Sequence, residues 1–117
     1  MNPLDGNPLL LAAAKASVGP QLLPDLVEHV QTHLGPRLDA YRREYERALR
    51  TDDYEVFFVE AGHWDDLGEE FDLEPRERDA VKRAHEEQLL HAGGEMDRRG
   101  EFDTALELRE VVVVGVE

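Results

Sequence analysis

The sequence contains no cysteine and a single serine, Ser17, and these absences exclude several kinds of chemistry. A chain without cysteine forms no disulfide, no thiolate zinc site and no cysteine nucleophile, and it suits a reducing cytosol. One serine outside any G-x-S-x-G motif argues against a serine hydrolase. The phosphate-binding G-x-G-x-x-G and P-loop motifs are also missing, so we expect no cofactor.

Lysine is the next scarce residue, and negative charge dominates the chain. The 117 residues include 27 Asp and Glu against 13 Lys and Arg, a net charge of −14, and only Lys15 and Lys82 are lysine. Residues 51–117 hold the whole surplus. Spreading this charge over a globule of roughly 17 Å radius costs on the order of 9 kcal/mol at 0.1 M salt and about 4 kcal/mol at 1 M. We therefore expect a protein that is most stable in concentrated salt.

Long hydrophobic runs are absent as well. No apolar stretch approaches the roughly 20 residues of a membrane span, and the N-terminal segment lacks the basic leader of a signal peptide. Apolar residues still make up 41% of the chain, enough for one ordinary hydrophobic core. These observations predict a single domain over residues 1–117, cytoplasmic and without membrane contact.

Hydrophobic spacing predicts an α+β domain, with about four helices packed on a small sheet of two or three strands. The segment 37–50 has the clearest helical period, because Leu38, Tyr41, Tyr45 and Leu49 recur on one face. Proline and glycine mark most of the predicted boundaries. The predicted helices are 7–17, 24–34, 37–50 and 76–92, with a short helical turn at 65–71, a turn at 51–53 and strands at 55–59 and 111–114.

Residues 101–109 fit two interpretations. Apolar residues alternate at Phe102, Leu106 and Leu108, which favours a strand, whereas the ALELRE segment consists of good helix formers. We follow the alternation and predict a strand. The apolar edge of the C-terminal strand invites pairing, and a sheet of two strands is marginally stable without a third strand, packed helices or a second copy of the chain. We therefore predict a homodimer that completes the sheet, formed through a β edge or through the face of helix 37–50.

Two histidines four residues apart, His29 and His33, lie on one face of a predicted helix and within reach of one metal ion. The intervening residues do not form the H-E-x-x-H motif, so a third ligand would have to come from the fold. We expect an ordinary histidine pair without metal; a metal-dependent enzyme that uses this pair is the weaker alternative. The remaining histidines are His63, His91 and His85, of which His85 is predicted to lie in the core.

His63 and Trp64 follow the strand at 55–59, in a predicted loop at 61–64. Loops often hold functional residues, and a Trp beside a His can stack on a ligand ring or anchor an interface. These two residues are therefore the candidate contacts for a ligand or a protein partner. The alternative is structural, with Trp64 covering the end of the core and His63 capping a turn.

The order of the predicted elements is that of a winged helix, which gives an alternative function, a DNA-binding regulator. Helix 76–92 would be the recognition helix, and the strands at 101–109 and 111–114 would form the wing. A net charge of −14 opposes contact with phosphates, so nucleic acid is disfavoured as a partner. The residues that would contact DNA are Arg76, Arg78, Lys82 and Arg83.

Scarce lysine, preferred arginine and surplus Asp and Glu resemble the cytosolic proteins of salt-loving archaea. Over nearly its whole length the chain also resembles a small haloarchaeal family with no assigned function. This resemblance implies an archaeal, halophilic source, and it brings no catalytic motif. The stretches on which it rests are NPLLLAAAKASVGPQLLPDLV, LGPRLDAYRREYE, EVFFVEAGHW, ERDAVKRAH and ALELREVVVVG.

Composition, motifs and resemblance together predict a non-enzymatic, halophile-adapted protein that binds another protein or a small molecule. We assign no catalytic, cofactor-binding or metal-binding residue from the sequence.

Overall fold

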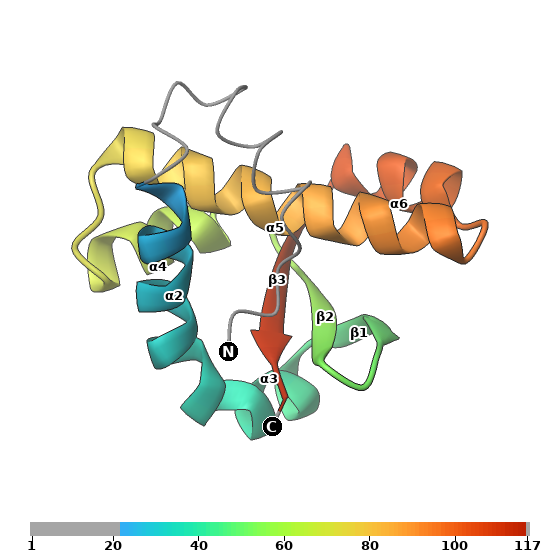
Figure 1. Ribbon diagram of the computed structural model, residues 1–117, viewed down its shortest axis with the longest axis horizontal. Helices are drawn as coiled ribbons and strands as arrows, with labels where there is room; N and C mark the ends of the chain where they lie inside the picture. The colour runs from blue at the N-terminus through green and yellow to red at the C-terminus, as the bar shows by residue number, and fades with distance from the viewer. Residues whose placement is uncertain (1–21, 117) are drawn as a thin grey trace.

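The computed structural model describes residues 22–116, and its α+β fold confirms the predicted class (Figure 1). The predicted helix 7–17 lies outside these residues. None of the helices within 22–116 has the length and hydropathy that crossing a bilayer requires. In chain order the elements are α2 (Leu23–Leu34), η1 (Gly35–Arg37), α3 (Leu38–Glu44), β1 (Glu46–Arg50), β2 (Tyr54–Val59), α4 (His63–Glu70), α5 (Pro75–Glu95), α6 (Arg99–Leu106) and β3 (Glu110–Gly115).

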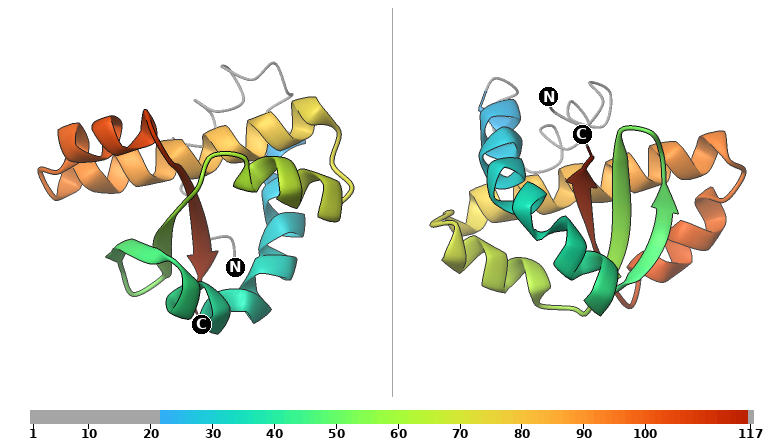
Figure 2. Two further views of the ribbon diagram at one scale, coloured as in Figure 1. Left: turned by 180° about the vertical axis from the view of Figure 1, so that it is seen from behind. Right: turned by 90° about the horizontal axis from the view of Figure 1, so that it is seen from below.

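β2 is the central strand of an antiparallel sheet in the order β1-β2-β3, and both of its faces are covered. On one face Phe58 packs against Phe102 of α6, with ring centroids 6.4 Å apart. On the other face Phe57 packs against Tyr41 of α3, at 5.7 Å. Figures 1 and 2 show α5 running past the strands, with α6 alongside its C-terminal half. The strands predicted at 55–59 and 111–114 are confirmed.

The prediction of one helix over 37–50 is wrong beyond Glu44. Tyr45 adopts an extended conformation, with φ −129° and ψ 156°, and residues 46–50 form the edge strand β1. Pairing with β2 buries Ala48 and Leu49, so contacts between distant segments override the helical period of the sequence. A β-bulge between Arg47 and Leu49 interrupts this pairing.

The prediction of a strand at 101–109 is also wrong, because residues 99–106 form α6. Helical spacing brings Phe102, Ala105 and Leu106 against the core, whereas Thr104 and Leu108 are exposed. The intrinsic helix preference of the segment therefore decides its structure. A helix here leaves no wing beside β3, so the described part of the chain does not support the winged-helix interpretation.

The predicted start of the long helix at Glu74 and Pro75 is confirmed. Glu74 is the N-cap of α5, and its N–H donates to Glu77 Oε1 at 2.9 Å in a capping box. The helix continues past Gly93, where α6 approaches closely. A Cβ atom at Gly93 would lie 2.6 Å from Cδ2 of Phe102, so only glycine allows this contact.

Side chains from three helices occupy the outer edge of β3, the edge that does not pair with β2. The Trp64 indole of α4 donates to Val111 O at 2.8 Å. His85 Nδ1 of α5 accepts from the Val113 N–H at 2.8 Å. The Gln31 amide of α2 donates to Val113 O at 2.6 Å and accepts from the Gly115 N–H at 3.0 Å. These side chains cover the β3 edge at which pairing with a second chain was expected, and the homodimer itself stays a prediction.

Candidate functional site

A carboxylate from β3 fixes the first turn of α4, where His63 lies. Glu110 accepts hydrogen bonds from the N–H groups of Gly62 and Trp64, each at 2.9 Å, and Lys82 Nζ lies 3.4 Å away. Burial alone would raise the pKa of Glu110, but these donors and Lys82 lower it below its usual range. Gly62 has a φ of 96°, a conformation that favours glycine. His63 and Trp64 are thus the first two residues of a helix, which corrects the predicted loop at 61–64.

Three side chains surround His63 and form what we call the His63 cluster, which consists of Tyr41, Tyr45, Glu60 and His63. The Tyr41 hydroxyl oxygen lies 2.7 Å from His63 Nε2, and Glu60 Oε1 lies 3.9 Å from Nδ1. The Tyr45 ring centroid is 5.1 Å from that of Tyr41 and 5.4 Å from that of His63. Tyr41 is buried, Tyr45 is half-buried and Glu60 is exposed. The cluster therefore presents one phenol ring and one carboxylate to solvent.

Burial sets the protonation states of the His63 cluster. It raises the pKa of the Tyr41 phenol, and it lowers the pKa of the His63 imidazole more than the nearby carboxylates raise it. At neutral pH the phenol keeps its proton and His63 is neutral; a hydrogen bond joins the Tyr41 hydroxyl to Nε2, and Nδ1 faces Glu60. A phenol that stays protonated at neutral pH is a poor nucleophile there.

Of the predicted pair, only His63 has contact with solvent. Trp64 is fully buried, its indole N–H is bonded to β3, and its ring packs edge-on against His85 with centroids 4.7 Å apart. Trp64 thus has no surface to offer a ligand. The predicted core position of His85 is confirmed, since its side chain is fully buried.

His29 and His33, the pair that the weaker alternative would use to bind a metal, pack against Phe71. The His33 ring stacks on Phe71 with centroids 4.8 Å apart, and His29 Nε2 lies 3.4 Å from Phe71 O. The two imidazoles meet edge to face at 5.0 Å. Within residues 22–116 no three His, Asp or Glu side chains are placed to share a metal ion. The structure therefore brings no third ligand to this pair from its described residues.

Carboxylates neutralise three of the four basic residues predicted to contact DNA. A guanidinium or ammonium that is already paired contributes less to phosphate binding. The contacts are Arg78 with Asp65 (3.2 Å) and Asp79 (3.0 Å), Lys82 with Glu110 (3.4 Å) and Arg83 with Glu86 (3.9 Å), while Arg76 is exposed.

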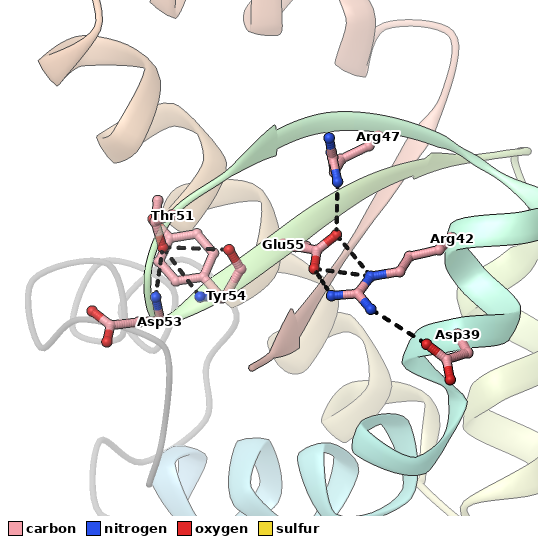
Figure 3. Close-up of polar contacts among 7 residues, drawn as sticks. All are labelled: Asp39, Arg42, Arg47, Thr51, Asp53, Tyr54 and Glu55. Carbon is pink, nitrogen blue, oxygen red and sulfur yellow. Dashed lines mark hydrogen bonds and ion pairs between the residues drawn. The ribbon is translucent and has the colours of Figure 1, made fainter. Parts of the chain in front are cut away.

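The structure also contains an ion-pair cluster around Glu55 that the sequence analysis missed (Figure 3). Glu55 lies in β2 and is fully buried, and its carboxylate accepts hydrogen bonds from Arg42 of α3 and Arg47 of β1. Arg42 Nε lies 3.2 and 3.0 Å from the two oxygens, and Arg47 Nη1 lies 3.2 Å from one of them. The bonds from Arg42 hold the pKa of Glu55 below its usual range despite its burial. The cluster thereby joins β1 and α3 to the central strand.

One signal for this cluster was present in the sequence. A glutamate inside an otherwise apolar strand needs a cation, because a buried carboxylate is unstable without one. The helix predicted over 37–50 placed Arg42 and Arg47 on a solvent-facing surface and so hid their role. Only the break at Tyr45 brings both arginines onto the Glu55 face of the sheet.

Replacing Glu55 with glutamine should lower the free energy of unfolding by about 1–2 kcal/mol, because it removes two charge-assisted interactions. The arginines are 41% and 46% exposed, so solvent screening keeps the loss below that of a fully buried pair. Urea unfolding in concentrated KCl measures the effect. The matched control is Asp39→Asn, which removes only an exposed carboxylate from Arg42 and should cost less than about 0.5 kcal/mol. Equal stability of Glu55→Gln and the wild type would contradict the prediction.

Comparison with known proteins gives one match. A family model described as a domain of unknown function (DUF8048) covers residues 2–116. No curated protein and no solved structure matches the chain.

Proposed function

The chain belongs to the DUF8048 family of domains of unknown function, and from that premise we propose that it is a non-enzymatic binding module. The His63 cluster is its ligand-binding surface, and the ligand presents a positively charged group, either on a small molecule or on a protein partner. The observation that supports this proposal is the half-buried ring of Tyr45, which lies against His63 and whose phenol is influenced by the charges of two carboxylates.

The surroundings of Tyr45 suit a cation. Burial raises the pKa of the Tyr45 phenol, and the charges of Glu60 and Glu44 raise it further, so both carboxylates act on this ring. An ammonium or guanidinium group gains energy over the face of an aromatic ring, and nearby carboxylates add to that attraction. Tyr41 and His63 are held to each other at 2.7 Å, and both contact the Tyr45 ring.

Tetramethylammonium tests this proposal, because it binds aromatic surfaces and donates no hydrogen bond. We expect the ring NMR signals of Tyr45 and His63 to shift saturably when tetramethylammonium chloride replaces KCl at constant ionic strength. Tyr45→Leu should abolish the shifts of the His63 signals, while the buried Tyr54 signals stay unchanged in both proteins. Equal shifts in the wild type and in Tyr45→Leu would contradict a site at Tyr45.

The proposal extends to the solvent in which the protein works. We propose that the surplus of acidic residues adapts this module to the concentrated salt of a halophilic archaeal cytoplasm. The support is the net charge of −14, with lysine at only two of the 13 basic positions, and the complete absence of cysteine.

A further inference from the structure

Helices α5 and α6 leave a groove of about 270 Å³ between them. The helices pack closely where Phe102 meets Gly93, and the groove lies beside the middle of α5 and the C-terminal end of α6. Leu90 and Leu106 give it an apolar lining. Charged side chains supply the rest, and they are Arg83, Glu86, Glu87, Asp103 and Glu107.

Negative charge dominates this groove. Four carboxylates line it against the single guanidinium of Arg83, which lies 3.9 Å from Glu86. Burial raises the pKa of Glu86; Arg83 and Lys82 act in the opposite direction, and the charges of Glu110 and Glu87 raise it further. A further cation brought into the groove would stabilise the ionised form of Glu86.

An exposed leucine extends the apolar surface beside the groove. Leu108 follows the lining residues Leu106 and Glu107, and 81% of its surface is exposed, the largest value among the large apolar residues of the described chain. Burying a leucine side chain contributes roughly 1.5–3 kcal/mol, so Leu108 gives a partner a further apolar contact.

We propose that this groove docks a basic segment of a partner protein, with an apolar side chain between Leu90 and Leu106 and lysine or arginine against the carboxylates. The alternating apolar and acidic lining suits an amphipathic helix with a basic face. Phosphates of a nucleic acid would be repelled by the same carboxylates, and a second copy of the chain would bring another net charge of −14. None of the groove residues belongs to the His63 cluster, so binding at the groove does not depend on binding at that cluster.

Two designed peptides test the proposal by fluorescence polarisation. One contains leucine and lysine in an amphipathic helical pattern, and the other has glutamate in place of every lysine. Measurements use the full chain at a KCl concentration where circular dichroism shows it folded. We expect saturable binding of the lysine peptide only, and backbone NMR shifts confined to the groove and Leu108.

Matched charge reversals separate the groove from the net charge. Asp103→Lys with Glu107→Lys should weaken the lysine peptide about tenfold, because these carboxylates line the groove. Asp52→Lys with Asp53→Lys adds the same charge at the exposed turn between β1 and β2 and should weaken it less than about twofold. Leu108→Ser should weaken binding several-fold without changing the fold.

Three results would overturn the proposal. The first is no binding of the lysine peptide, and the second is equal binding of the glutamate peptide. The third is equal loss of affinity in both double variants, which would show attraction to net charge alone. Circular dichroism of each variant ensures that only folded proteins are compared.

Discussion

His85→Asn should remove a large part of the acid sensitivity of this protein. Burial lowers the pKa of His85 to about 3, against an ordinary value near 6.5 in the unfolded chain. The unfolded state therefore binds one more proton than the native state between these values, and stability falls as the pH falls through that window. From pH 6.5 to 4.5 the wild type should lose about 2 kcal/mol more than His85→Asn, since a full pH unit is worth about 1.4 kcal/mol and the unfolded histidine is half protonated at pH 6.5.

Asparagine is the informative replacement because its side-chain oxygen can accept the Val113 N–H bond that His85 Nδ1 accepts in the wild type. The variant should be about 1–3 kcal/mol less stable at pH 7, because it leaves a small cavity beside Trp64. Urea unfolding at intervals between pH 7 and 4.5 measures the difference between the two slopes. All carboxylates and His63 are shared by both proteins, so their titration cancels. Parallel slopes would show that His85 does not control the response, and His91→Asn serves as a partly exposed control.

Raising KCl from about 0.1 to 1 M should increase the free energy of unfolding by several kcal/mol. The radius of gyration of 12.9 Å corresponds to a sphere of roughly 17 Å, over which a charge of −14 loses about 5 kcal/mol of self-repulsion in this range. Salt also reduces the self-repulsion of the unfolded chain, so the net increase in the free energy of unfolding is smaller than this figure. A rise in Tm of about 10 °C or more is the expected reading by circular dichroism.

A charge variant distinguishes repulsion from general effects of salt on hydration. Asp52→Lys with Asp53→Lys changes the net charge from −14 to −10. Because self-repulsion scales with the square of the charge, the KCl effect should fall to roughly half. An unchanged Tm across the KCl series, or an equal salt effect in both proteins, would remove the argument for a halophilic habitat.

Local signals in the sequence were sufficient for β2, β3 and α5. β2 and β3 are apolar runs bounded by turns, and α5 begins with the Glu74–Pro75 signal. Two of the errors concern segments whose structure is decided by long-range contacts or by intrinsic preference. Residues 46–50 have a helical period but pair with β2, and residues 101–109 alternate like a strand but form α6. Periodicity alone cannot reveal which neighbour a segment will meet.

The sequence anticipated part of the candidate site. His63 was singled out, but its partners Tyr41 and Tyr45 were assigned to the inner face of a longer helix. Contact between them requires α3 to end at residue 44 and α4 to begin at His63. Neither boundary has a strong local signal. Gly62 was therefore interpreted as part of a loop, and Tyr45 as a helical residue.

The position of β3 in the chain has a consequence for biosynthesis. One side of β2 pairs only with residues 110–115, and Gln31, Trp64 and His85 find their partners on the same late strand. Until residues 110–115 have been translated, the nascent chain therefore holds an apolar strand of which one side has no partner. Tertiary structure must form after translation of the strand is complete, and until then the exposed segment is a binding target for chaperones.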